Sequence, residues 1–267
     1  MFRFAPLILS LALAPPAVAG GKGDGLFLHE RSPEAEQPTP PDAPIITPRQ
    51  QFIQSNVIET LYHELGHALI DILDLPVYGN EEFAADVFSV ILMNRLHDKE
   101  EVARLARNVA GAYAEEARRA KLRGQTHDAW DIHGSDMQRY YNLACLFYGA
   151  DPEGRTDLAD ALDLPRERAR SCRDEFDLAN RSWGHVLDQL EAEAPGDSLH
   201  IDWTLHDDQL TRFITAEIAR LNQVMALPEP LAVSVIPCDE INAYYSIDKR
   251  EITFCTEYAT HMGKLFR

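Results

Sequence analysis

The chain has 267 residues, enough for one sizeable domain or two small ones. Hydrophobic residues make up 45% and charged residues 25%, a globular composition that argues against a disordered or fibrous protein. The 43 Asp and Glu outnumber the 25 Lys and Arg, so the formal net charge is −18 at pH 7. This acidity argues against nucleic acid or an anionic lipid surface as the partner, because both attract basic faces.

The first 19 residues have the pattern of a secretory signal peptide. A short positive start, Met1–Arg3, precedes an apolar run from Phe4 to Ala14, and Ala17–Ala19 has the small-residue spacing of a cleavage site. The alternative is an uncleaved anchor helix, which three prolines and a run shorter than ~20 residues disfavour. The sequence therefore predicts a secreted or periplasmic protein, with no later stretch apolar enough to span a membrane.

The number of cysteines fits this expectation. The chain has four, at Cys145, Cys172, Cys238 and Cys255, and an even number suits an oxidising compartment. None has CxxC spacing, which argues against a zinc cluster of cysteines. Of the three possible pairings, proximity in sequence favours Cys145–Cys172, joining two helices, and Cys238–Cys255, joining the strands of a hairpin.

The elements expected in chain order are mostly helices. Residues 20–48 are rich in Gly, Pro and acidic residues and are expected to form a flexible leader, either a propeptide or a plain linker. One domain, 49–267, follows. Helical patterns cover 49–75, 80–97, 99–122, 137–148, 157–162, 165–190 and 207–225.

The C-terminal part differs in character. Residues 231–236 are strand-like, while 243–246 and 252–255 flank a polar turn in the pattern of a β-hairpin. We therefore predict an α+β fold: a helix hairpin over 49–97, a helical region over 98–195, and a final part, 196–267, with a small antiparallel sheet.

The segment His63-Glu64-Leu65-Gly66-His67 is an HExxH motif. Two histidines four apart on a helix share a face and can hold one metal ion, with Glu64 placed to contact a water on that ion. A chance match in such a chain is roughly a 3% event, so the context matters. The surrounding helix is apolar except for one polar stripe. If this stripe is buried, its polar groups need partners, which a metal ion would supply; the alternative is that the stripe faces solvent. The stripe consists of Asn56, Thr60, His63, Glu64, His67 and Asp71.

A third ligand is expected from the next helix. The metzincin pattern fails, because Ile70 and Leu73 stand where it needs Gly and His. Glu82 instead follows a tight turn that would bring it back toward the histidines. Two histidines and one carboxylate, with the fourth position left to water, form a catalytic zinc arrangement, so we expect one Zn²⁺.

Other carboxylates have less certain roles. Asp86 is four residues after Glu82 and is expected to accept the second ring N–H of a ligand histidine. Glu81 is the alternative ligand, although acidic residues also favour a helix start on electrostatic grounds alone. Asp71 either bonds a ligand histidine or is an ordinary carboxylate at the helix end.

Several segments together resemble a bacterial family of secreted, metallopeptidase-like proteins catalogued as a domain of unknown function. The resemblance implies that His63, His67 and Glu82 hold zinc and that Glu64 is the base. Asn80, where a basic residue is common, and Ile241 depart from the pattern, but neither is an expected ligand. The resemblance rests on residues 63–71, 75–77, 79–86, 131–142, 145, 148–152, 242–245 and 252–255.

The two carboxylates Glu82 and Asp86 also resemble those of the glutamate-ligand zincins, which place a substrate-binding edge strand beside the HExxH helix. Our hypothesis is that residues 242–257 fold back beside that helix and supply this strand, to which a peptide could add. The alternative is that the hairpin only covers a helical core.

His133 is the expected group for polarising the scissile carbonyl or stabilising the oxyanion, although an ordinary polar histidine is the simpler possibility. The alternatives for this role are Tyr140, Tyr141, Tyr244 and Tyr245. Six histidines lack ligand spacing and are expected on the surface or in packing: His97, His127, His185, His200, His206 and His261.

The sequence thus predicts a zinc-dependent hydrolase acting on a peptide or protein. Glu64 would take a proton from the activated water and deliver it to the leaving amine. One alternative is a non-catalytic exported helical module with a structural or vestigial metal site. Another is a metal-free, disulfide-stabilised domain with a chance motif.

Overall fold

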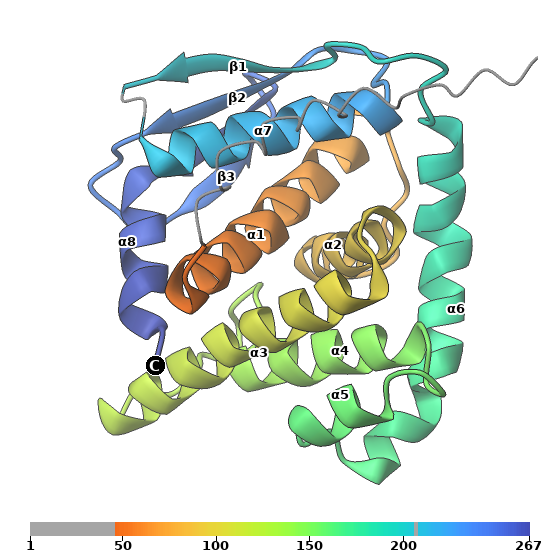
Figure 1. Ribbon diagram of the computed structural model, residues 1–267, viewed down its shortest axis with the longest axis vertical. Coiled ribbons are helices and arrows are strands. Elements are labelled where there is room, and N and C mark those ends of the chain that lie inside the picture. The colour runs from red at the N-terminus through yellow and green to blue at the C-terminus, as the bar shows by residue number, and fades with distance from the viewer. Residues whose placement is uncertain (1–45, 206–207) are drawn as a thin grey trace, which may run out of the picture. The chain divides into compact units, whose positions relative to one another are not determined.

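The computed structural model describes residues 46–205 and 208–267 (Figure 1). The predicted signal peptide, most of the predicted leader and His206 lie outside the described residues. The elements are α1 (Pro48–Ile72), α2 (Glu81–Leu96), α3 (Lys99–Leu122), α4 (Asp136–Gly149), α5 (Thr156–Ala161), α6 (Arg166–Gln189), β1 (Leu199–Thr204), α7 (Gln209–Val224), β2 (Leu231–Ile236), β3 (Ala243–Ser246), β4 (Glu251–Cys255) and α8 (Thr256–Leu265). The α+β prediction is confirmed.

Helix α1 runs through the middle of this arrangement. Figure 1 shows the sheet and α7 on one side of it and α2, α3 and α4 on the other. The helix begins with a capping box, in which the Thr47 hydroxyl accepts from the Gln50 amide and the Gln50 side chain accepts from the Thr47 amide. Pro48 suits the first helical position because its missing N–H has no partner there.

Helix α1 ends three residues earlier than its apolar pattern predicts. Asp74 has a left-handed backbone with φ 49°, and the Leu75 amide donates back to the Ile70 carbonyl at 2.9 Å. The Asp74 amide donates to the Asp71 carbonyl at 3.2 Å, completing a Schellman motif. This motif turns the chain at Leu73, before Pro76 can end the helix.

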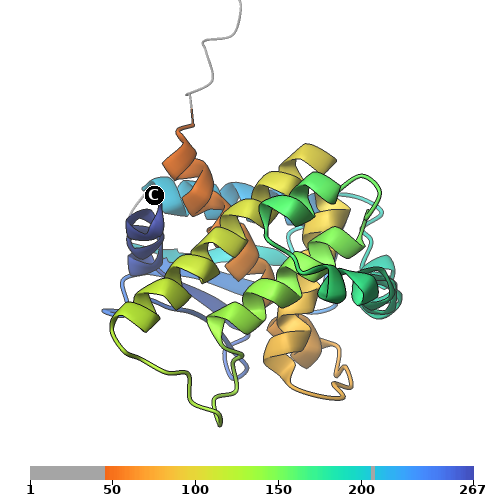
Figure 2. The ribbon, with the colours of Figure 1, turned by 90° about the horizontal axis from the view of Figure 1, so that it is seen from below.

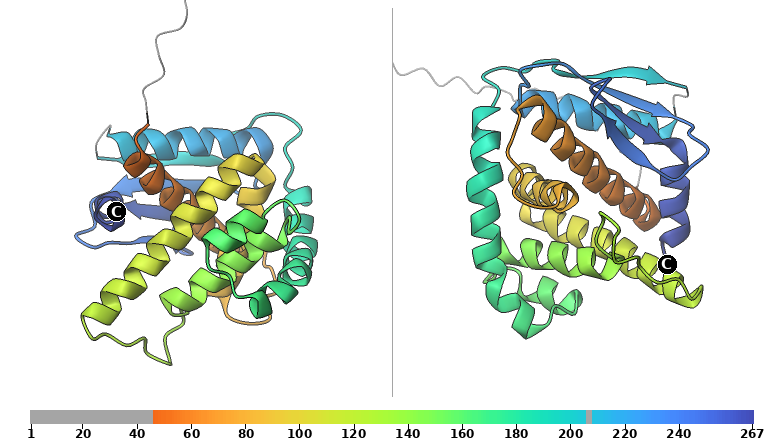
Figure 3. Two further views of the ribbon diagram at one scale, coloured as in Figure 1. Left: turned by 60° about the horizontal axis from the view of Figure 1, so that its bottom comes forward. Right: turned by 180° about the vertical axis from the view of Figure 1, so that it is seen from behind.

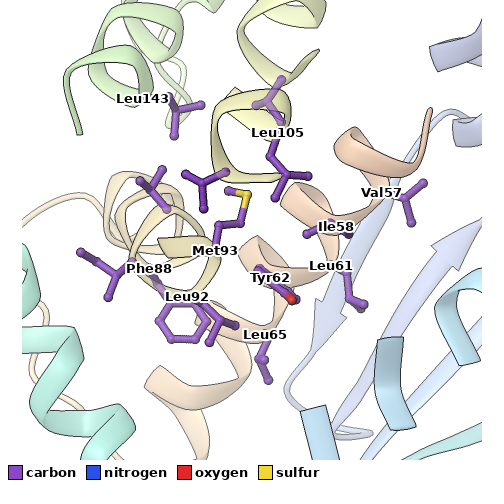
Figure 4. Packing of buried hydrophobic residues seen from close by; sticks show 14 of the residues in the cluster. Val57, Ile58, Leu61, Tyr62, Leu65, Phe88, Leu92, Met93, Leu105 and Leu143 are labelled. Carbon is purple, nitrogen blue, oxygen red and sulfur yellow. The ribbon is translucent and has the colours of Figure 1, made fainter. Parts of the chain in front are cut away.

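The close packing of α2 on α1 explains the glycine within the HExxH segment. A Cβ at Gly66 would lie 3.1 Å from the Ala85 Cα and 3.2 Å from the Phe88 ring. Figure 4 shows the apolar contact that continues from there, with Leu65 of α1 facing Phe88 and Leu92 of α2. Both helices are therefore held at short range where the histidines lie.

The sheet is mixed, which corrects the predicted antiparallel sheet. Its strand order is β1-β2-β4-β3; β1 and β4 each pair parallel with β2, and only the β3–β4 hairpin is antiparallel. Parallel pairs require a crossover, which α7 supplies between β1 and β2. The sequence did not predict β1, a short edge strand whose apolar residues alternate with His200 and Asp202.

Both predicted disulfides are present. Cys145–Cys172 joins α4 to α6, and Cys238–Cys255 joins the end of β4 to the segment after β2. The second bond therefore does not link two hairpin strands as expected, because Cys238 precedes β3. Figure 2 shows α3 and α4 side by side on the helical side of the molecule. Among the described residues, no helix combines the length and apolarity that a bilayer crossing demands.

Candidate metal centre

The polar stripe of α1 meets the first turn of α2. The Nε2 atoms of His63 and His67 lie 3.2 Å apart. The Glu82 Oε2 atom lies 3.3 Å from the first and 3.6 Å from the second. Ligand atoms about 2.0–2.1 Å from a tetrahedral zinc ion lie about 3.3–3.4 Å from one another. These three atoms therefore have the spacing of three corners of a zinc tetrahedron.

The start of α2 places Glu82 by local means. The Asn80 side chain caps the helix by accepting from the Glu82 amide at 2.8 Å. Its amide group also donates to the Ile132 carbonyl, which ties the segment before α4 to the same helix end. Gly134 lets that segment approach, since a Cβ there would lie 2.8 Å from the Phe83 ring. The same cap therefore positions both Glu82 and the loop that carries His133.

Each histidine has a carboxylate on its other ring nitrogen. The His63 Nδ1 atom lies 2.8 Å from the Asp86 Oδ1 atom, and the His67 Nδ1 atom lies 2.7 Å from the Glu81 Oε1 atom. Because a carboxylate can only accept, each Nδ1 carries the proton and each Nε2 offers its lone pair to an ion. Asp86 is placed as expected, whereas Glu81, the alternative ligand, faces Nδ1 and not the triad of ligand atoms.

Arg139 of α4 completes this arrangement and was missed by the sequence analysis. Its guanidinium donates to both Asp86 oxygens, at 2.9 Å for the Nε contact, and lies 4.8 Å from the centroid of the Tyr113 ring. Arg139 is the one basic residue of α4 and lies one turn before its buried apolar residues, which was the available signal. Asp86, Glu59 and His63 could also meet around an ion, but this pairing already neutralises Asp86.

The charges of the cluster reinforce one another. Burial lowers the pKa of His63, but hydrogen bonds to Asp86 and Glu82 outweigh it and raise that pKa to about 10. Burial raises the pKa of Glu82, but its interactions with both histidines outweigh burial and hold that pKa well below the usual range. Without an ion, the histidines therefore attract protons and the glutamate stays ionised. A metal cation would replace those protons.

Glu64 lies next to His63 on α1, on the side that faces the hairpin. Its side chain is buried, which raises its pKa, while the charges of His63 and His67 and, less strongly, the backbone amide of Tyr245 on β3 oppose that rise. The Tyr245 hydroxyl donates to Asp71 at 2.7 Å. Figure 3 shows the hairpin beside α1. Asp71 therefore bonds the hairpin rather than either histidine.

A groove of about 820 Å³ opens over these groups. The triad and Glu64 form one wall, and β3, the outermost strand of the sheet, forms another. The prediction that the hairpin folds back beside the HExxH helix thus agrees with the structure. The groove is lined by His63, Glu64, His67, Ile70, Asp71, Asp74, Leu75, Asn80, Glu81, Glu82, Ile132, His133, Asn242, Ala243, Tyr244, Tyr245 and Ile247.

A family model described as "Putative metallopeptidase" matches residues 35–187 and 197–267. The chain belongs to this family. Membership of this metallopeptidase family indicates a metal-dependent hydrolase, and the matched residues include both walls of the groove. No curated protein and no solved structure matches the chain.

The residues predicted to stabilise the oxyanion divide into those that line the groove and those that do not. His133 lines the groove, with its Nε2 atom 3.2 Å from the Glu82 Oε2 atom. Tyr244 and Tyr245 line it as well. Tyr140 and Tyr141 do not line the groove. Tyr140 donates to the Leu162 carbonyl, and the Tyr141 ring packs edge-on against the Tyr140 ring.

The other described histidines lie outside the triad. His97 is buried against Glu101, and His185 contacts Gln189 on α6. His127 and His200 are exposed. His261 bonds Glu116 in a smaller cavity next to the groove.

Proposed function

We propose that this protein is a zinc-dependent peptidase in which His63, His67 and Glu82 hold the ion. The observation that supports this most strongly is the 3.2–3.6 Å spacing of their three ligand atoms. Three protein ligands are typical of catalytic zinc sites, whereas structural sites are closed by four. The groove beside the triad gives a substrate access to the remaining position.

The chain's own groups suit the steps of amide hydrolysis. When bound, zinc lowers the pKa of a water molecule and polarises a carbonyl. Glu64 accepts the proton of the attacking water and passes it to the leaving amine, and its burial raises its pKa toward the range that such a shuttle needs. Asp86 and Glu81 hold the two histidine rings in the productive tautomer.

His133 is the group that we assign to the developing charge on the substrate. Asp131 holds it in place, accepting from its backbone amide at 2.9 Å and facing its Nδ1 atom at 3.2 Å. A His133 ring that carries both protons would donate from Nδ1 to Asp131 and would turn its Nε2–H from Glu82 to a substrate oxygen. Tyr245, whose hydroxyl donates to Asp71, is the alternative donor for this charge.

The free edge of β3 is the proposed binding site for the substrate backbone. The Cys255 amide donates to the Asn242 carbonyl at 3.1 Å, so Asn242 faces β4. Antiparallel pairing alternates, and Ala243 and Tyr245 therefore direct their backbone groups away from β4. Both line the groove, where an extended peptide can add as a further strand through the backbone groups of Ala243 and the Tyr245 carbonyl, while the Tyr245 amide faces Glu64.

Metal content and proteolysis together test this function. The purified protein should contain one zinc per chain, and the Glu82→Ala variant should contain much less. An unfolded protein substrate should be cleaved by the zinc-loaded protein and left intact after chelation. Zinc that stays bound in Glu82→Ala, or cleavage that persists without metal, would contradict the proposal.

A further inference from the structure

We propose that this groove selects peptides with a lysine or arginine side chain close to the scissile bond, and that Asp136 and Glu116 recognise that side chain. This inference rests on the proposed peptidase function and adds the class of substrate.

A second cavity continues the groove past the reaction centre. It has a volume of about 280 Å³ and shares His63, Glu64, His133, Asn242 and Ala243 with the groove. It extends toward the N-terminal end of α1, between α3, α4 and α8. A peptide paired with β3 and reaching beyond Glu64 in this direction would place a side chain in this cavity. Its size suits one side chain better than a folded segment.

Carboxylates outnumber the basic groups around both cavities, which include four histidines: His63 and His67 are proposed zinc ligands, His133 faces Glu82, and His261 bonds Glu116. Of the described residues that line them, the only Lys or Arg is Arg139, whose charge the bidentate contact with Asp86 neutralises. Eight carboxylates line the two cavities, and of these Glu81 and Glu116 are paired with His67 and His261. The eight are Glu59, Glu64, Asp71, Asp74, Glu81, Glu82, Glu116 and Asp136.

Asp136 is the carboxylate best placed to bind a cation from a substrate. In the described part of the chain its side chain has no hydrogen-bond or ion-pair partner, and it lines the second cavity from the first turn of α4. Burial raises its pKa, and the neighbouring charge of Glu116 adds to this rise, while the charges of Arg139 and His127 oppose it. A lysine or arginine side chain between the two carboxylates would relieve that repulsion.

The other carboxylates of the second cavity also favour a cationic substrate side chain. Glu59 is buried, and its contacts, to the Thr60 hydroxyl at 3.3 Å and the Tyr113 hydroxyl at 3.4 Å, are long. Glu116 is bonded by His261. An acidic substrate side chain would meet like charges here, and an apolar one would desolvate carboxylates without replacing their water contacts.

Peptide cleavage by the zinc-loaded full chain tests the selection. Peptides that carry Lys, Gln or Glu at each position around one cleavage site should differ in kcat/KM, with Lys preferred over Glu by about tenfold at the selective position. The Asp136→Asn and Glu116→Gln variants should each reduce this ratio at least threefold. Asp174→Asn makes the same charge change on the exposed surface of α6 and should keep the wild-type ratio.

Peptide binding separates this inference from the proposed function. Binding of the fluorescently labelled Lys and Glu peptides is measured in the Glu64→Gln background, with and without Asp136→Asn. Cleavage without a charge preference would overturn the inference and leave the peptidase standing. The opposite outcome is also possible: the Lys peptide binds preferentially, Asp136→Asn abolishes this preference, and the wild type cleaves neither peptide. That result would support the charge selection and rule out the proposed peptidase function.

Discussion

The two walls of the groove are built in different ways. The wall formed by α1 and α2 comes from residues close in sequence: the ligand triad lies within His63–Glu82, on two helices joined by a short turn. The wall formed by β3 depends on distant contacts, such as the Tyr245–Asp71 hydrogen bond. The difference predicts that the proposed metal binding depends on local spacing, whereas the proposed substrate binding depends on how the C-terminal part packs against α1.

The largest expected effect is on catalysis and lies on the helical wall. The Glu64→Gln change removes the proton acceptor and should lower kcat by about 10²–10⁴-fold, the usual contribution of a general base. Zinc content should stay at one per chain, because Glu64 belongs to none of the proposed ligand contacts. Rates are measured on a peptide and zinc by elemental analysis. A variant with wild-type turnover would exclude Glu64 from the mechanism.

Removing each disulfide in turn should show that the two walls depend on different disulfides. Replacing either pair with serines should lower the free energy of unfolding by about 3 kcal/mol, given closed loops of this length. Loss of Cys238–Cys255 should also raise KM, because this bond anchors the segment that leads into β3.

The Cys145–Cys172 pair, which joins α4 to α6, is the matched control and should change stability with little change in KM. Denaturant unfolding and steady-state kinetics measure the two effects. Equal shifts in KM for both pairs would show that the hairpin needs no separate anchor.

The carboxylates behind the two histidines should contribute unequally. Asp86→Asn should weaken zinc binding about 10–100-fold, the usual range for a group that orients a metal ligand. Glu81→Gln should have a smaller effect, because the Glu81 side chain is 51% exposed and that of Asp86 only 5%. Competition titrations with a chromogenic chelator give both affinities, and the reverse order would contradict this assignment.

The smallest expected effect concerns the bond between the walls. Tyr245→Phe removes one hydrogen bond to Asp71 and should cost about 1 kcal/mol of stability. We expect KM to rise a few fold with kcat nearly unchanged, since the edge strand moves while the metal ligands stay in place. A fall in kcat without a change in KM would instead point to a direct role of the hydroxyl in the reaction.

The sequence predicts the helical wall well for a physical reason. HExxH spacing, the Asn80 cap and the turn before α2 are all local, so the positions of His63, His67 and Glu82 follow from helix periodicity. The mixed sheet is different, because parallel pairing joins strands far apart in the chain and is not encoded in any one strand. Arg139 was missed for the same reason: its partner Asp86 is 53 residues away.

The short length of β3 has a consequence for the behaviour of the protein in solution. An unpaired strand edge is a template for aggregation, and natural proteins protect such edges with charge or by keeping them brief. Here the edge strand β3 is only four residues long and the other edge strand, β1, only six, and the whole chain carries −18. Two copies meeting edge to edge would bring like charges together. The acidity that favours binding of a peptide with a cationic side chain therefore also discourages self-association.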